Sequence, residues 1–173
     1  MFSKEVSPQQ EKKSSFDTIP LQELTTPLVI GYYNGWNARS KCHETKPDDL
    51  PGKYPWLFQP TLNPSSSDHA FLMSALTHIN FAFAFVDPDT YAIVPMDDKT
   101  PTSLFADTTN LKLINPGLRV FISFGGWTFS DNNTVTQPLL GNICRDAEKR
   151  RKFAAKIVDF MVTYGFDGLD LDW

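Results

Sequence analysis

The chain has 173 residues, of which 41% are hydrophobic and 21% charged, and its formal net charge is −4. This balance gives no excess of positive charge to attract nucleic acid or an anionic membrane surface. The longest largely apolar run, Ile79–Val86, is far shorter than the roughly 20 residues that a membrane-spanning helix needs. Disorder along the whole chain is disfavoured, because 14 phenylalanines, 4 tryptophans and 5 tyrosines need a core in which to pack.

The first 27 residues, Met1–Pro27, are polar and lack the apolar segment of a secretion signal, so we expect a flexible leader without a signal peptide. A folded domain over residues 28–173 follows. A buried strand is expected at Leu28–Gly31, ending in a loop with a turn at Asn34-Gly35. Asn37–Pro64 contains five prolines and is predicted to be irregular, with a short helical turn at Phe71–Leu76.

Strand and helix patterns alternate over the rest of the chain. In order, we expect a strand at His78–Val86, a helix at Ser103–Asn115, a strand at Arg119–Phe124, a polar loop at Asp131–Asn142, a helix at Ala147–Tyr164 and a strand at Gly168–Trp173. The longest helix carries Phe153, Ile157, Phe160, Met161 and Tyr164 on one face. Such alternation predicts an α/β fold with a parallel sheet, in which ligands bind at the carboxyl ends of the strands.

The two cysteines, Cys42 and Cys144, are too few for a disulfide framework. One bridge in a secreted protein and two reduced thiols both remain open. Cys42 and His43 are adjacent, but no second pair of this kind completes a zinc site, so we expect no metal there.

The final segment, Phe166–Trp173, reads FDGLDLDW. Side chains alternate along a strand, so Asp170 and Asp172 share one face, and the two leucines and the tryptophan share the other, which we expect to be buried. Two carboxyl groups this close repel when both are charged, so the pair is expected to share a proton. A solvated turn fits this pattern poorly, whereas a Mg²⁺ or Ca²⁺ site stays open as an alternative.

A second cluster, SFGGW, spans Ser123–Trp127. The glycines Gly125 and Gly126 let the backbone leave the strand closely packed against its neighbours. No glycine-rich nucleotide-binding spacing follows, and Ser123 lacks the context of a nucleophilic serine. Ser123 is therefore expected to donate a hydrogen bond to a neighbouring carboxylate, and Trp127 to offer a flat apolar platform.

Aromatic residues follow the predicted strands at Tyr32-Tyr33 and Phe83–Phe85, as carboxylates do at Asp170 and Asp172. Aromatic rings cover the apolar faces of pyranoses and polar groups bind the hydroxyls, so this combination suits a sugar ligand. Core packing is the alternative for each single aromatic.

These motifs resemble those of a known family. FDGLDLDW is similar to the DGxDxDxE signature of family 18 glycoside hydrolases, the chitinases, and stops one residue before its glutamate. SFGGW resembles the SxGG motif of the family's third strand, GYYNGW its first strand and LTHINFAFAFVDP its second. GYYNGWNARSKC, PMD and GGWTFSDN together most resemble fungal class V chitinases of the killer-toxin-like subgroup. The resemblance covers Leu28–Pro51 and Ala75–Trp173.

The resemblance implies a (β/α)8 TIM barrel, of which this chain holds about the first four βα units, because a full barrel takes about 250 residues. It implies hydrolysis of β-1,4-linked N-acetylglucosamine polymers, chitin or chito-oligosaccharides, by substrate-assisted retaining catalysis without a cofactor. For the intact parent it implies a secreted monomer.

Carried over residue by residue, the resemblance makes Asp172 the group that orients the substrate's acetamido N–H, and Asp170 its proton-sharing partner. Asp167 shapes the start of the strand. The expected support and substrate-binding positions are Tyr32, Phe83, Ser123, Gly125, Gly126, Trp127 and Asp167.

Two departures from the family pattern carry further expectations. The general-acid glutamate would follow Trp173, and none of the three aspartates is placed to replace it, so we expect this chain as it stands to be inactive. The segment Gly52–Ser74 interrupts the pattern. Gly-Lys-Tyr can be encoded by GGT-AAG-TAY, which contains a GTAAGT donor site, so we expect a retained intron, with a genuine loop insertion as the alternative.

Three other interpretations remain open at this stage. One is a catalytically inactive chitin-binding or lectin-like member of the family, another is a fragment without function, and the third is an unrelated metal-dependent α/β protein. The identity of the residue after Trp173 separates the first from an enzyme.

Overall fold

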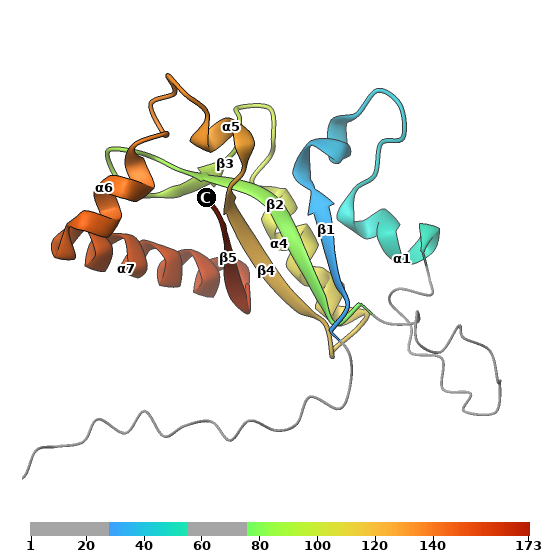
Figure 1. Cartoon of the computed structure of the whole chain (residues 1–173). Helices are drawn as coiled ribbons and strands as arrows, with labels where there is room; N and C mark the ends of the chain where they lie inside the picture. The colour runs from blue at the N-terminus through green and yellow to red at the C-terminus, as the bar shows by residue number, and fades with distance from the viewer. Residues whose placement is uncertain (1–27, 55–75) are drawn as a thin grey trace, which may run out of the picture.

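The computed structural model describes residues 28–54 and 76–173 (Figure 1). The predicted leader at residues 1–27 lies outside the described residues. So do residues 55–74 of the predicted insertion and all of the predicted turn at Phe71–Leu76 except Leu76.

A mixed sheet of five strands organises the described residues (Figure 1). Four of them run parallel in the order β1, β2, β4, β5, with bounds Ile30–Asn34, His78–Val86, Arg119–Gly125 and Gly168–Asp172. The short strand β3, Ile93–Pro95, pairs antiparallel with β2. The α/β class with a parallel sheet, expected from the alternating patterns, is confirmed.

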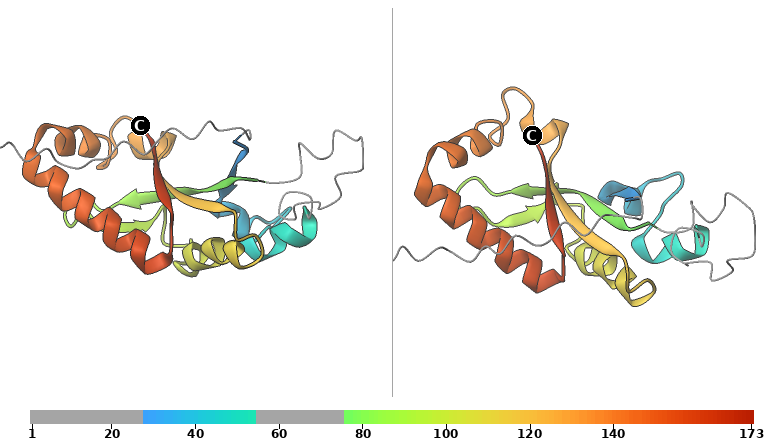
Figure 2. Two further views of the ribbon diagram at one scale, coloured as in Figure 1. Left: turned by 90° about the horizontal axis from the view of Figure 1, so that it is seen from below. Right: turned by 60° about the horizontal axis from the view of Figure 1, so that its bottom comes forward.

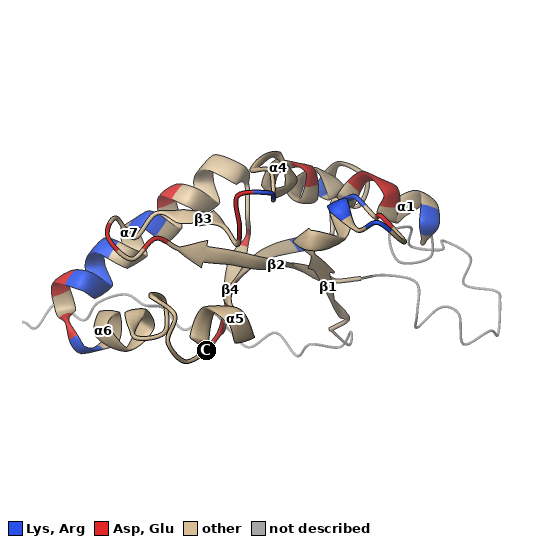
Figure 3. Cartoon of the chain, turned by 90° about the horizontal axis from the view of Figure 1, so that it is seen from above, with Lys and Arg blue, Asp and Glu red and all other residues tan. Residues whose placement is uncertain are grey.

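The helical elements, in chain order, are η1 (Gly35–Arg39), η2 (Pro47–Asp49), α1 (Leu50–Lys53), α4 (Ser103–Thr109), η3 (Asn110–Leu113), α5 (Trp127–Ser130), α6 (Leu139–Arg145) and α7 (Ala147–Tyr164). Helices α4 and α7 lie on the same side of the sheet (Figure 2). Acidic and basic residues both lie along α7 (Figure 3), whereas α4 has Asp107 as its single charged residue. None of the helices in residues 28–54 and 76–173 is both long and apolar enough to cross a membrane.

Helix α7 has the bounds that the sequence predicts. Asp146 caps its start by accepting hydrogen bonds from the backbone N–H groups of Glu148 and Lys149, and Gly165 ends it in a left-handed conformation. Three residues of the predicted apolar face, Phe153, Ile157 and Phe160, are buried. The helix therefore forms where local periodicity and both caps agree.

The core lies between the sheet and the helices α4 and α7. Phe105 on α4 is 1% exposed, and its ring centroid lies 5.0 Å from those of both Phe81 on β2 and Phe160 on α7. Ile122 and Phe124 on β4 face the same layer and are fully buried. Residues that alternate with these along the strands face the other side of the sheet, where the candidate site lies.

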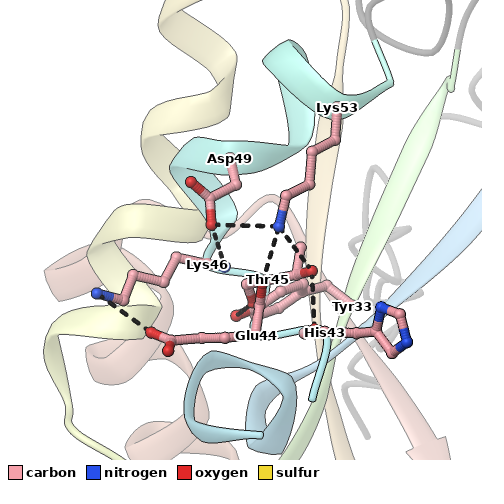
Figure 4. Close-up of polar contacts among 7 residues, drawn as sticks. All are labelled: Tyr33, His43, Glu44, Thr45, Lys46, Asp49 and Lys53. Atoms are coloured by element: carbon pink, nitrogen blue, oxygen red, sulfur yellow. Dashed lines mark hydrogen bonds and ion pairs between the residues drawn. The ribbon is translucent and has the colours of Figure 1, made fainter. Parts of the chain in front are cut away.

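The loop after β1 folds back on itself around Lys53 (Figure 4). The Lys53 ammonium donates to the Glu44 carbonyl at 2.8 Å and lies 3.7 Å from the carboxylate of Asp49. Tyr33 on β1 reaches the same loop, because its hydroxyl donates to the Thr45 carbonyl at 2.9 Å. Burial raises the pKa of Tyr33, since its phenolate would lose hydration.

Three local predictions differ from the structure. The first strand runs over Ile30–Asn34 rather than Leu28–Gly31, because the tyrosine pair continues the parallel pairing with β2. The polar loop predicted at Asp131–Asn142 instead leads into α6, whose Leu139, Leu140 and Ile143 are buried. Strand β3 was not predicted; its three residues are held by pairing with β2.

The expected burial of the apolar face of the last strand is wrong for two of its three residues. Leu169 packs against the core, but Leu171 is 52% exposed and Trp173 is 67% exposed. Among the described residues, strand β5 pairs with β4 alone. The two cysteines, Cys42 and Cys144, are exposed free thiols.

Candidate active site

Three hydrogen-bond donors from three strands converge on one oxygen of Asp170. Asp170 Oδ2 accepts from the Tyr32 hydroxyl at 3.0 Å, from Ser123 Oγ at 2.8 Å and from Asn80 Nδ2 at 3.3 Å. They meet because the parallel register places Tyr32 opposite Asn80 and Ser123 opposite Asp170. Asp170 Oδ2 is thus the common acceptor of all three hydrogen bonds.

The hydrogen bond to Asp170 also changes the acidity of Tyr32. It raises the pKa of Tyr32 above its ordinary value of 10.0, because the phenol must lose the proton that it donates, and partial desolvation adds to this effect. Tyr32 therefore stays a neutral donor throughout the neutral pH range.

Asp172 lies on the same face of β5 as Asp170 and is exposed. The two carboxyl groups make no hydrogen bond with each other, so the expected shared proton stays a prediction. The carboxyl group of Asp172 makes no hydrogen bond to any described residue either. This leaves it free to bind a ligand group from solution.

The glycine pair joins the two sequence motifs. Gly126 N–H donates to the Asp172 carbonyl at 2.9 Å, and a Cβ at Gly125 would lie 2.2 Å from that same oxygen. Gly125 and Gly126 both have positive φ, 107° and 82°, which side chains disfavour. The glycines therefore fix the backbone that carries Asp172, and they act as packing elements as the sequence suggested.

Aromatic rings lie beside the glycine pair that contacts the backbone of Asp172. The rings of Trp36 and Phe83 stack with centroids 6.4 Å apart, and with Met96 and Trp127 they line a hollow of about 140 Å³. Trp127 is 86% exposed, and a second hollow of about 270 Å³ lies between it and Asn132. Trp127 thus offers an open apolar face at the carboxyl end of β4.

Asp167 does not join the other expected site residues. It lies just before β5, at the opposite end of the strand from Asp172, and its carboxylate accepts from Val120 N–H at 2.9 Å and from Lys112 at 3.1 Å. Arg119 lies 3.5 Å away. Partial burial opposes its ionisation, but these partners outweigh burial, so the pKa of Asp167 lies below its ordinary value of 3.8. Its position fits the strand-shaping task and not substrate contact.

Two residues at the candidate site, Asn80 and Trp36, were not singled out from the sequence. Asn80 is the one polar residue within the apolar run Ile79–Val86, which was a usable signal. Trp36 lies within the GYYNGW motif, but its ring stacks on Phe83 only because the chain forms the 3-10 helix η1 after β1.

In residues 28–54 and 76–173, no three histidine, cysteine, aspartate or glutamate side chains are grouped so that they could hold a metal ion. Asp170 Oδ2 already accepts three hydrogen bonds, which leaves it poorly placed as a metal ligand.

The fold and the site place the chain among α/β proteins whose ligand sites lie at the carboxyl ends of parallel strands. Residues 28–173 match the family model described as Glycosyl hydrolases family 18. The chain therefore belongs to this family, and the parallel sheet is part of the family's TIM-barrel fold.

Curated relatives and solved structures carry chitinase names. The chain is 38% identical to Chitinase B of Serratia marcescens over 102 residues, which are 57% of this chain and 20% of that protein. It is 37% identical to Chitotriosidase-1 of Mus musculus over 97 residues, 56% of this chain and 19% of that protein.

The solved structures include a mutant of catalytic domain 2 of the Ostrinia furnacalis Group II chitinase, in complex with penta-N-acetylchitooctaose. Its TM-score is 0.62 at 29% identity, covering 84% of this chain and 32% of that chain. The chain spans about a fifth of the length of these curated relatives and about a third of the solved one.

Proposed function

We propose that this chain provides the first four βα units of a chitinase catalytic domain, which hydrolyses β-1,4-linked N-acetylglucosamine polymers. The observation that carries the proposal is the Asp170 carboxylate with its three donors. The exposed ring of Trp127 directly follows Gly126, whose N–H donates to the Asp172 carbonyl. Membership of family 18 and the chitinase names of the relatives support the proposal.

In the proposed mechanism the substrate's own N-acetyl oxygen attacks the anomeric carbon and forms an oxazolinium ion. Asp172 orients the acetamido N–H for this attack and shares a proton with Asp170. Tyr32 and Ser123 hold the Asp170 carboxylate in place. Trp127 and Phe83 stack on sugar rings. A glutamic acid protonates the leaving oxygen, which lowers the barrier because an alkoxide is a poor leaving group.

Binding without hydrolysis is the second candidate, for the polypeptide of residues 1–173. The glutamates among the described residues are Glu44 and Glu148. Glu44 pairs with Lys46 in the loop after η1, and Glu148 pairs with Arg151 at the start of α7, so neither belongs to the site. This polypeptide would bind the acetamido group and the sugar rings. None of the glutamates among its described residues would protonate the leaving oxygen.

Calorimetric titration with chitotetraose, together with an assay on a chromogenic chitobioside, tests both candidates. We expect saturable binding by the polypeptide of residues 1–173 and no measurable hydrolysis. Trp127→Ala should weaken binding about tenfold, because one stacked aromatic face is lost. The matched control is Leu113→Ala, which alters a side chain that is equally exposed on η3 and should bind like the unmodified chain. Absence of binding would reject the proposal, and turnover would reject the second candidate.

The finer assignments are proposals as well. The GYYNGWNARSKC pattern supports the fungal class V, killer-toxin-like subgroup. The exposed sequon at Asn132 is compatible with a secreted monomeric parent, which a mass shift on deglycosylation of the naturally produced protein would test. The interpretation of Gly52–Ser74 as a retained intron would be contradicted by mature transcript reads that contain every codon from Pro51 to Ala75, those of Gly52–Ser74 included.

A further inference from the structure

Asn80 lies within the sheet beneath the candidate site and is only 5% exposed. Its amide nitrogen donates to Asp170 Oδ2, whereas its amide oxygen is buried and accepts no hydrogen bond from the described residues. A buried acceptor without a partner destabilises a fold, because its hydration is lost and not replaced. An apolar side chain of the same size would avoid this cost.

Asp170 determines which way the amide points. In the opposite orientation the amide oxygen of Asn80 would face Asp170 Oδ2, and two acceptors would lie against each other. The unpaired oxygen is therefore a consequence of the hydrogen bond that the nitrogen donates.

The three donors to Asp170 differ in their freedom. Ser123 is fully buried and Asn80 nearly so, whereas Tyr32 is 57% exposed and can turn toward solvent or a ligand. The two buried donors thus hold Oδ2 from within the sheet. Oδ1 accepts no hydrogen bond from the described residues and is the oxygen left for a neighbour such as Asp172.

We propose that Asn80 is a positioning residue for this site. It holds the Asp170 carboxylate in one orientation, with Oδ2 as a hydrogen-bond acceptor, and it makes the fold less stable than an apolar residue would. Asn80 acts through Asp170 and does not touch substrate. The assignment rests on the proposed function only in treating Asp170 as part of the active site.

The effect of Asn80 on the stability of the fold and its effect on the orientation of Asp170 can be measured separately. Asn80→Leu removes the donor and the unpaired acceptor together and keeps the number and branching of the side-chain heavy atoms. A residue that only supports the fold would lower the Tm when replaced in this way. A positioning residue would leave the Tm unchanged or raise it, while Asp170 loses its fixed orientation.

The test uses the polypeptide of residues 1–173 with ¹³C-labelled aspartate, and reads the side-chain couplings and carboxyl resonance of Asp170 by NMR. In Asn80→Leu we expect averaging over several Asp170 rotamers and a Tm no lower than that of the unmodified chain. The matched control is Asn115→Leu, because Asn115 is 8% exposed and its side-chain oxygen accepts from Gly117 N–H at 3.1 Å. The control should lower the Tm and leave the Asp170 signals unchanged.

Asn80→Asp is a second variant that keeps the shape of the side chain. It places a second carboxyl group against Asp170 Oδ2, so the pair should retain one more proton at neutral pH than the unmodified chain does. Unchanged Asp170 couplings in Asn80→Leu, or no extra proton in Asn80→Asp, would overturn the assignment.

Chitotetraose titration keeps the two proposals apart. Asn80→Leu should weaken binding about tenfold, because binding must then also order the Asp170 carboxylate. If the unmodified chain binds no chitotetraose while Asp170 still depends on Asn80, the proposed function fails and the positioning role stands. If it binds and Asp170 is indifferent to Asn80, only the positioning role fails.

Discussion

Asp167 and Asp170 belong to one short motif, yet the fold gives them separate tasks. Asp167 lies before β5 and pairs with Lys112 and with the backbone of Val120, whereas Asp170 meets its donors on the face of the sheet that carries the candidate site. The sequence shows both as acidic residues three positions apart. Only the strand register reveals that one fixes the start of β5 and the other belongs to the site.

Replacing Asp167 with asparagine should lower the free energy of unfolding by about 1–2 kcal/mol at neutral pH, because charge-assisted hydrogen bonds are lost. The pKa of Asp167 is depressed in the folded state, so its contribution is present above the ordinary value of 3.8 and is lost as the pH falls through the lower folded value. Urea denaturation of both proteins at a series of pH values measures this. A difference that persists unchanged at strongly acidic pH would contradict it.

Tyr32 should titrate above its ordinary pKa of 10.0, and Asp170→Asn should bring the pKa of Tyr32 back toward that value. The reason is that the carboxylate, its main partner, favours the neutral phenol. Any stabilisation from this contact is present below pH 10 and is lost as the pH rises through the folded pKa of Tyr32. Phenolate absorbance, with Tyr32→Phe as the reference that removes this one signal, gives the measurement. An unchanged titration in Asp170→Asn would show that the contact does not form.

At the scale of elements, some helices and strands follow from the local sequence pattern, whereas others depend on tertiary packing. Helix α7 follows from its periodicity, its Asp146 cap and its Gly165 stop. Helix α6 and strand β3 are short, so they carry too few residues for a pattern and are held by burial of α6 and by pairing with β2. The end of β4 is fixed by contact with the backbone of Asp172.

Gly125→Ala should therefore destabilise the protein by about 2–4 kcal/mol, because the new Cβ meets the Asp172 carbonyl and the positive φ is strained. Gly141→Ala is the matched control: its Cβ would have only ordinary contacts within α6, so it should stabilise by about 0.5–1 kcal/mol. Urea denaturation compares the two. Equal effects of both substitutions would refute the close approach of β4 to Asp172.

At the scale of the whole molecule, the described sheet ends in two parallel strands, β1 and β5, each paired on one side among the described residues. Apolar side chains accompany both edges: Leu28, Ile30, Leu171 and Trp173 are each at least half exposed. Unpaired, apolar strand edges promote association.

The polypeptide of residues 1–173 should accordingly self-associate with rising concentration. A lysine at position 171, introduced by Leu171→Lys, should reduce this association because it places a charge at the β5 edge. Leu113→Lys, which places the same charge at an exposed position on η3, outside both edge strands, serves as the control. Light scattering after size exclusion reports the mass, and a concentration-independent monomer for the unmodified chain would contradict the expectation.

The sequence by itself determined the family, the α/β class, the longest helix and the motifs that carry Ser123, Gly125, Asp170 and Asp172, because these depend on residue type and short-range spacing. The tertiary structure decided the register of β1, the separation of Asp167 from the site and the hydrogen bond between Asn80 and Asp170. Those features depend on which strands lie side by side. Tyr32, Asn80 and Ser123 meet on the carboxylate of Asp170 only after four parallel strands have paired.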